Sequence, residues 1–213
     1  MKNLLSMQRG ITMIEVMVSV AIIAIVMAVG VPSLSTWLQN SQVMSTAESV
    51  LTGLQLARGE AVRQNNLAQF TLTGNAAGTA DWTIVTASSS VPGSFALADG
   101  ATEIQKAGAS EMGANARLMV SSAVIATNCC TNVITTPIDM SAAPKPGVVF
   151  NAFGQVVSDP SVTTLSRIDV IKVGDTDANT EEKSRRRVIL ISPSGSAKLC
   201  RPSLPSSNPQ GCP

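Results

Sequence analysis

MQRGITMIEVMVSVAIIAIVMAVGVP, residues 7–32, decides the fold of this 213-residue chain. Between Ile11 and Val31 the only charged side chain is that of Glu15. A helix of about 20 apolar residues spans about 30 Å, the thickness of the hydrocarbon core of a bilayer. The preceding stretch is polar and basic, and Lys2 and Arg9 would hold that end in the cytoplasm. We therefore predict one membrane-spanning helix over residues 11–32, with the residues that follow it in the periplasm.

Glu15 is costly at this place unless it has a partner. An acidic side chain at the centre of a membrane helix costs roughly 2.5–3.5 kcal/mol, and less near an interface. A new N-terminal amine on Ile11 would compensate this charge, from within the helix or from a neighbouring helix in a staggered bundle. Such pairing would set the axial register, as buried polar groups do in coiled coils. The alternative is a plain single-pass anchor with Glu15 at the headgroup level.

The run RGITMIEVMVSVAIIAIVMAVGVP resembles the leader and N-terminal helix of type IV pilins and type II secretion pseudopilins. The resemblance implies that residues 1–10 are a leader, that prepilin peptidase cuts after Gly10, and that the new amine of Ile11 is methylated. It also implies that Glu15 guides assembly and that Pro32 loosens the helix. Ile11 departs from the phenylalanine that the family usually has at this position.

Residues 33–66 are predicted to form an amphipathic helix. Ser33 or Ser35 could cap a restarting helix; if Pro32 only kinks the path, one helix runs from Ile11 to about Asn65 and spans roughly 80 Å. Apolar residues at helical spacing predict the face that packs on the rest of the chain: Trp37, Met44, Ala47, Leu51, Leu54, Ala57 and Ala61.

The end of this helix, LQLARGEAVRQN, is similar to the corresponding stretch of the GspH/FimT (FimU-like) group of minor pilins and pseudopilins. Gly59 stands where that group commonly has a serine. The charged residues Arg58, Glu60 and Arg63 could carry assembly contacts. We favour the alternative, an exposed helix end whose charges compensate one another.

From residue 67 the pattern changes to short β-branched segments separated by Gly, Pro, Asn and Ser. LAQFTLTG, DWTIVTA, GVVFNAFGQVV, LSRIDVIKV and RRRVILISPSG are the predicted strands. We expect an α+β protein, in which an antiparallel sheet or small sandwich over residues 67–213 packs on the amphipathic helix in a pilin-like arrangement. The stretch VVFNAFGQV again resembles the GspH/FimT group. Residues 87–147, rich in Ala, Gly and Ser, are expected to form irregular loops.

The composition argues against an enzyme. The chain has no histidine, the commonest general base and metal ligand, and no nucleophile with a base and an orienting group. We therefore expect no cofactor and no metal. DTDANTEE, residues 175–182, has the alternating carboxylates of a calcium loop, but Thr180 and Arg186 stand where such a loop needs glycine and glutamate. A solvated hairpin loop is the favoured interpretation.

Four cysteines lie at positions 129, 130, 200 and 212, without the spacing of paired zinc ligands. After an export segment, disulfides are the better interpretation. Three pairings are open, and we favour Cys200 with Cys212, whose bridge would close about a dozen residues and contribute up to ~3 kcal/mol. A bridge between Cys129 and Cys130 is uncertain, because neighbouring Cα atoms lie only ~3.8 Å apart.

Binding of DNA is possible but not favoured. The formal net charge is +1, and it gives no general affinity for nucleic acid. A basic set of Arg185, Arg187, Lys198 and Arg201 is the candidate contact. Some FimT-type pilins bind DNA through a GRxR motif, but the aligned stretch here, GSAK at residues 195–198, keeps only the glycine and one basic residue. Losing arginines removes bidentate phosphate contacts.

These observations predict a minor type IV pilin, a structural subunit that helps to initiate or cap a pilus. Its partners would be other minor and major pilins, prepilin peptidase, and the inner membrane before assembly. It would be a single-pass inner-membrane protein with a periplasmic head, and later part of a pilus or pseudopilus. The alternatives are a DNA-capturing competence pilin and a pseudopilin of type II secretion.

Overall fold

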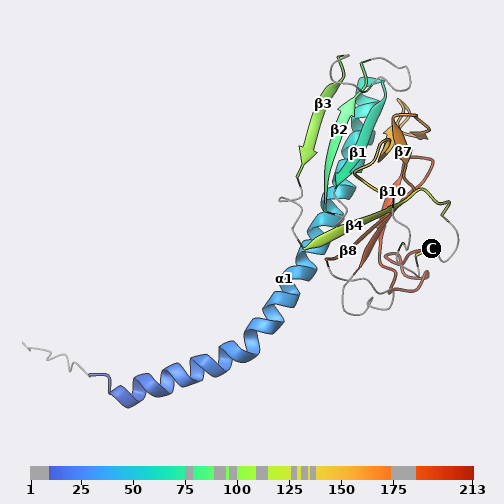
Figure 1. Ribbon diagram of the computed structural model, residues 1–213. Coiled ribbons are helices and arrows are strands. Elements are labelled where there is room, and N and C mark those ends of the chain that lie inside the picture. The colour runs from blue at the N-terminus through green and yellow to red at the C-terminus, as the bar shows by residue number, and fades with distance from the viewer. Residues whose placement is uncertain are drawn as a thin grey trace, which may run out of the picture. The chain divides into compact units, whose positions relative to one another are not determined.

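The structure is a computed structural model that describes residues 10–74, 79–88, 95, 100–108, 115–125, 129–130, 134, 138–173 and 186–213. The chain divides into two compact units, Met1–Leu38 and Gln39–Pro213. The single long helix of the described part, α1, covers Met13–Gln64 and therefore belongs to both units (Figure 1).

Helix α1 has defined ends and continues through Pro32. At its start the backbone N–H of Glu15 donates to the carbonyl of Thr12 at 3.1 Å and lies 3.4 Å from the Thr12 hydroxyl. At its end Asn65 takes a positive φ of 51°, and Asn66 N–H donates to the carbonyl of Ala61 at 3.1 Å. This is the Schellman geometry that closes many helices. The alternative of a helix restarting at Ser33 or Ser35 was wrong.

The buried face of α1 follows a seven-residue repeat. Six fully buried residues are spaced alternately four and three apart: Val43, Ala47, Val50, Leu54, Ala57 and Ala61. The predicted face was correct for four of these and wrong for Trp37, which is 62% exposed. Met44 and Leu51 are only partly buried, because each follows a buried valine by one residue and is turned about 100° from it around the helix. The helix therefore packs along a narrow stripe.

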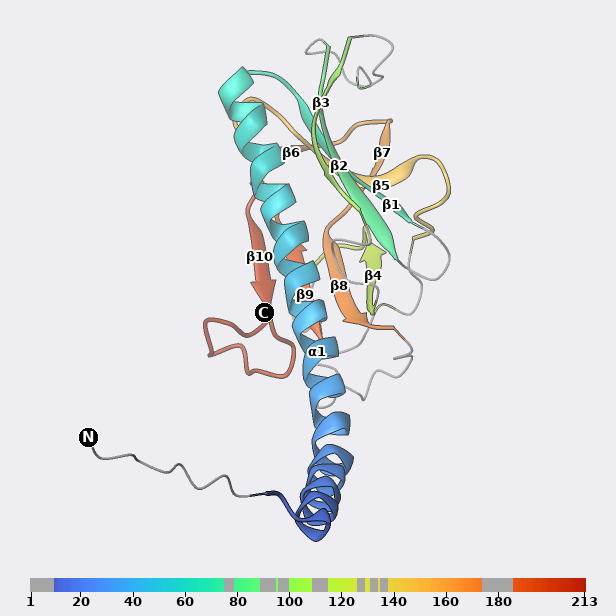
Figure 2. The same cartoon turned by 90° about the vertical axis from the view of Figure 1, so that its left-hand side faces the viewer.

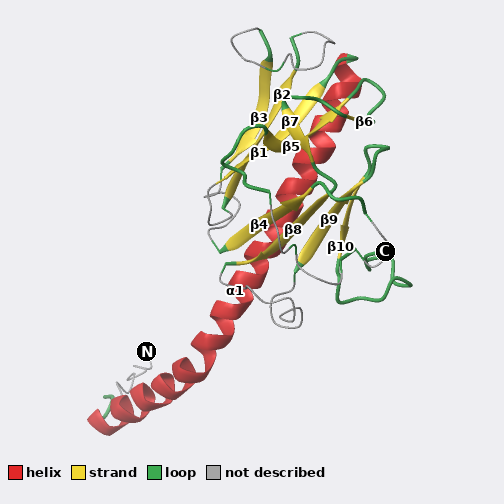
Figure 3. Cartoon of the chain, turned by 45° about the vertical axis from the view of Figure 1, so that its right-hand side comes forward, coloured by secondary structure: helices red, strands yellow, loops and turns green. Residues whose placement is uncertain are grey.

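Ten strands in the described residues form two sheets. The first sheet has the strand order β3-β2-β1-β5-β6 with antiparallel pairing, and β7 pairs with β5 in parallel. Its strands are β1 Ala68–Gly74, β2 Ala80–Thr86, β3 Thr102–Ala107, β5 Lys145–Phe150, β6 Val156–Val157 and β7 Val162–Thr164. The second sheet is antiparallel in the order β10-β9-β8-β4: β4 is Ala116–Ser121, β8 Arg167–Lys172, β9 Arg187–Ile191 and β10 Ala197–Cys200. Figures 2 and 3 show the Gln39–Gln64 part of α1 running along both sheets.

A close contact joins α1 to the first sheet. A Cβ added at Gly53 would lie 2.8 Å from Cε2 of Phe70, so only glycine allows the helix to approach this ring without a shift. Phe70 stacks on Trp82 with ring centroids 6.0 Å apart. The indole N–H of Trp82 donates to the hydroxyl of Ser49 at 3.1 Å, which satisfies the one polar atom of a buried side chain.

The predicted α+β class is confirmed: α1 packs on two mainly antiparallel sheets. The five predicted strand segments overlap β1, β2, β5 with β6, β8 and β9. The prediction of irregular loops over residues 87–147 was wrong for β3 and β4. Four of the six residues of β3 are exposed, so its sequence has no alternation of apolar and polar residues that would predict a strand. In β4 buried and partly buried residues do alternate, but the segment was missed because the surrounding sequence is rich in alanine.

Candidate functional site

The predicted cleavage site lies in accessible backbone before the helix. Gly10 and Ile11 precede Met13, the first residue of α1, and Ile11 is 76% exposed. A side chain added at Gly10 would meet no atom within 4 Å. The predicted leader, apart from Gly10, lies outside the described residues.

The next residues present apolar side chains to the surroundings. Between Met13 and Met27 most of the large apolar side chains are more than half exposed, from Met13 at 86% to Val16 at 51%. Glu15 lies in the first turn and is exposed, and its carboxylate has no ion-pair partner among the described residues. Among all the residues that the structure describes, no helix is long and apolar enough to cross a membrane. The predicted span over residues 11–32 stays a prediction.

Arg58 joins the end of α1 to two turns of the sheets. Its Nε donates to the carbonyl oxygen of Gly154 at 3.0 Å, in the turn between β5 and β6. Gly195, in the turn between β9 and β10, lies against this turn so closely that a Cβ there would overlap the Gly154 carbonyl. Both glycines have positive φ, 73° and 81°, which side chains disfavour. A hydrogen bond of 3.0 Å from Val156 N–H to the carbonyl of Pro193 closes the contact.

Glu60 and Arg63 pair with each other within the helix. Nη2 of Arg63 lies 2.6 Å from Oε2 of Glu60, and the side chain of Gln64 donates to the same oxygen at 2.9 Å. The hydrogen bond from Arg63, followed by that from Gln64, holds the pKa of Glu60 below its usual value. Glu60 and Arg63 therefore form the helix end with mutually compensating charges that the sequence favours. Arg58 does not belong to this pair, because it donates to the carbonyl of Gly154.

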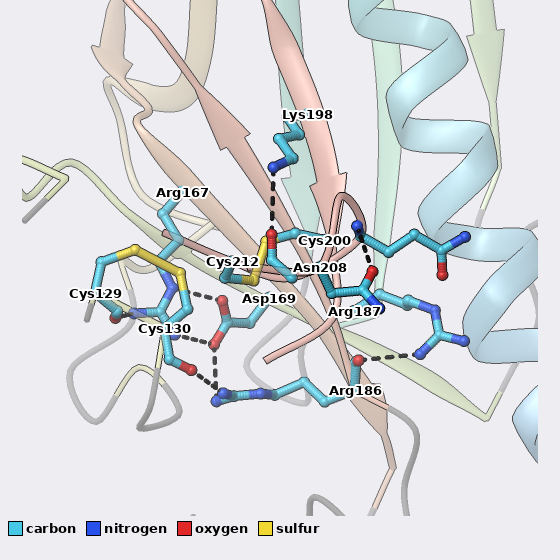
Figure 4. The surroundings of a disulfide bond; sticks show 12 residues. Cys129, Cys130, Arg167, Asp169, Arg186, Arg187, Lys198, Cys200, Asn208 and Cys212 are labelled. Atoms are coloured by element: carbon cyan, nitrogen blue, oxygen red, sulfur yellow. Dashed lines mark hydrogen bonds and ion pairs between the residues drawn. A yellow bond between two sulfur atoms is a disulfide. The ribbon is translucent and has the colours of Figure 1, made fainter. Parts of the chain in front are cut away.

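The structure contains two disulfides, Cys200–Cys212 and Cys129–Cys130 (Figure 4). The first closes the tail that follows β10, and its Cα atoms are 5.1 Å apart. The Sγ atoms of Cys130, Cys200 and Cys212 all lie within 4.8 Å of one another, so the two bridges lie close together in one buried cluster. Val188 and other apolar residues surround them in a small core of their own.

A charged cluster that the sequence did not predict lies beside the Cys129–Cys130 bridge. The carboxylate of Asp169 is fully buried and accepts hydrogen bonds of 2.7 and 2.6 Å from Nε and Nη2 of Arg167. Arg186 is also buried, with its Nη1 3.5 Å from the same carboxylate. Arg167 donates to the carbonyl of Cys129, and Arg186 to that of Cys130 (Figure 4). The sequence does hold one indication of this cluster: Asp169 is an acidic residue within the largely apolar segment IDVIKV.

The residues proposed for DNA contact do not form one exposed basic surface. Arg187 is buried, and its Nε lies 3.2 Å from Sδ of Met44 on α1. Lys198 is exposed and donates to the carbonyl of Gly211 at 3.2 Å, while Arg201 is half-buried. Arg185 and residues 175–182, for which a solvated hairpin loop is favoured over a calcium loop, lie outside the described residues. Arg187 is not open to a ligand, because strand β9 is buried along its whole length.

A small cavity of about 150 Å³ opens beside the tail. Its lining combines two arginines with apolar and amide side chains: Met44, Arg187, Leu199, Cys200, Arg201 and Gln210. The stretch GSAK, residues 195–198, lies where a turn leads into β10. Gly195 is in the turn, and Ala197 and Lys198 already belong to β10.

Two protein families match the chain. The prokaryotic N-terminal methylation motif matches residues 5–31, and the family described as type II transport protein GspH matches residues 46–195. No curated protein matches the chain significantly.

Two crystal structures of the type IV minor pilin FimU from Pseudomonas aeruginosa (strain PAO1) are similar to it. One is 22% identical with a TM-score of 0.44, covering 81% of this chain and 96% of FimU. The other is 21% identical with a TM-score of 0.40, covering 79% of this chain and 98% of FimU.

Proposed function

The chain belongs to the GspH family of type IV pilin-like proteins, and on that premise we propose that it is a minor type IV pilin that helps to initiate or cap a pilus. Members of this family are structural subunits, not enzymes. The observation that carries the proposal is the match of residues 5–31 to the N-terminal methylation motif at the start of a 52-residue helix.

The proposed processing would create an ion-pair partner for Glu15, which has none among the described residues. Cleavage after Gly10 would free the amine of Ile11, which lies one helical turn from Glu15 and is exposed with it. In a bundle of parallel helices, the amine of one subunit would meet Glu15 of the next. The exposed apolar side chains that follow support burial against lipid and later against other helices, since burying one such side chain is worth about 1.5–3 kcal/mol.

This proposal divides the chain into four parts: leader 1–10, filament-core and membrane segment 11–32, amphipathic helix 33–66 and periplasmic head 67–213. The partners would be other pilins, prepilin peptidase and the inner membrane. Two disulfides support a head that folds in an oxidising compartment. Of the residues proposed for DNA, only Lys198 is exposed in the described part of the chain, and its ammonium already donates to Gly211, so capture of DNA is not favoured.

The test replaces Glu15 by alanine, with Glu48→Ala as the matched control because Glu48 is an exposed acid on the same helix. We expect both variants in the membrane fraction at the level of the unchanged chain. Only Glu15→Ala should be depleted from filaments sheared off the cells. Recovery of Glu15→Ala in filaments at the control level would overturn the assembly role of this carboxylate.

A pseudopilin of type II secretion is the second candidate, because the matched family is described as a type II transport protein. The two functions separate in a strain that lacks this chain. Loss of surface pili with normal release of a secreted enzyme supports the pilus. The reverse result would assign the chain to secretion.

A further inference from the structure

The contact between the two disulfides places a third sulfur beside each bridge. Sγ of Cys130 lies within 4.8 Å of both Cys200 Sγ and Cys212 Sγ. Thiol–disulfide exchange proceeds by attack of a thiolate on a disulfide sulfur, so it requires sulfurs that can meet. We propose that the four cysteines form an exchange site, at which an incoming thiol opens Cys129–Cys130 and Cys130 then attacks Cys200–Cys212. This proposal does not depend on the pilus role.

Burial decides which sulfur an external thiol reaches first. Cys130 and Cys200 are 2% and 1% exposed and Cys212 is 8% exposed, whereas Cys129 is partly exposed. An external thiolate, from a small thiol or from a thiol oxidoreductase, therefore attacks Cys129. Attack there leaves the electron pair on Cys130, which is the sulfur within 4.8 Å of both sulfurs of the second bridge.

The charged cluster favours this direction. Arg167 and Arg186 bring two guanidinium groups to the backbone of the bridge, against the single carboxylate of Asp169 among the described contacts. Neighbouring positive charge stabilises a thiolate and makes its sulfur a better leaving group. The exchange site thus gives these buried charges a use beyond pairing with one another.

The electron count balances without an oxidant. In the first step the external thiolate bonds to Sγ of Cys129, the Cys129–Cys130 bond breaks, and Cys130 leaves as a thiolate. In the second step Cys130 bonds to Sγ of Cys200 or Cys212, the Cys200–Cys212 bond breaks, and the other sulfur of that pair leaves as a thiolate. The product carries the external thiol on Cys129, one new bridge from Cys130 to the tail, and one free thiol.

Trypsin makes this product easy to recognise. Both original bridges lie within single tryptic peptides, Cys129–Cys130 between Arg117 and Arg167, and Cys200–Cys212 after Lys198, because the intervening Lys145 and Arg201 precede prolines that block cleavage. Exchange creates a link between these two peptides. No link between them exists in the starting protein.

The experiment uses the full chain in detergent and reduced glutathione as the probe. After brief exposure, free thiols are alkylated in acid and the tryptic peptides are identified by mass spectrometry. We expect glutathione on Cys129 together with the interpeptide bridge from Cys130. Glutathione on Cys129 with an alkylated Cys130 and no interpeptide bridge would overturn the second step, and glutathione on Cys130, or no reaction, would overturn the first.

A double variant, Cys200→Ser with Cys212→Ser, isolates the first step. It should still take glutathione on Cys129 but leave Cys130 to be alkylated. The variant Cys129→Ser starts with Cys130 reduced beside the intact second bridge, and should form the interpeptide link without any added thiol. If its Cys130 is alkylated under native conditions while Cys200–Cys212 persists, the proximity does not lead to exchange and the proposal is wrong.

Discussion

Replacing Arg58 by methionine tests whether the contact between α1 and the two turns stabilises the head. Methionine keeps most of the apolar stem of the side chain but removes the N–H that donates to the carbonyl of Gly154 at 3.0 Å. A hydrogen bond to a charged group contributes about 1.5–3 kcal/mol. Because Arg58 is half-buried, and so partly screened by solvent, we expect the lower end, about 1.5 kcal/mol.

For a chain of this length, each kcal/mol moves the melting temperature by about 2–4 °C, so Arg58→Met should lower it by about 3–6 °C. The assay is thermal unfolding of the full chain in detergent, followed by the circular dichroism of the sheets. Arg63→Met is the comparison variant: it breaks only an exposed ion pair within the same helix, so it should lower the melting temperature less than Arg58→Met. Equal melting temperatures for the two variants would refute the reasoning.

Two further predictions concern pH and DNA. The pKa of Glu60 is held below its ordinary value of 4.5, so the pairing of its carboxylate stabilises the fold above about pH 4.5. This stabilisation is lost as the pH falls through the lower pKa of the folded state. Glu60→Gln should therefore have a lower melting temperature than the unchanged chain at neutral pH, and the difference should disappear in acid. Fluorescence titration of the full chain with duplex DNA at several salt concentrations should show no tight binding and no effect of Lys198→Ala. Binding that weakens both with added salt and in this variant would contradict the inference that the missing arginines of the GRxR motif abolish DNA binding.

The elements that the sequence predicts correctly are those with a strong local pattern. The long helix is one, and the strand that contains Phe70 is another, because β-branched and aromatic residues alternate there between turn residues. Trp37 was wrongly predicted to be buried, because helical spacing alone does not distinguish neighbouring positions around the helix when the buried stripe is narrow. The packing partner of the helix decides which of these positions is buried.

The rest depends on contacts between residues far apart in the chain. Nothing near Arg58 in the sequence indicates Gly154 or Gly195, although a glycine at each turn is a local signal for positive φ. The contact of Cys130 with the second bridge is also set by tertiary structure. Spacing along the chain limits which cysteines can pair, but it says nothing about which bridges touch.

The largest core of the head is not divided between its two sheets. One cluster of buried side chains contains residues of α1 and of both sheets, with Ile84 from the first and Ile168 from the second. Each sheet also has a smaller buried cluster of its own, but opening either sheet would expose its share of this common core. The head should behave as one cooperative unit, so damage to a strand of either sheet would loosen both, and neither sheet could be exchanged alone between related proteins.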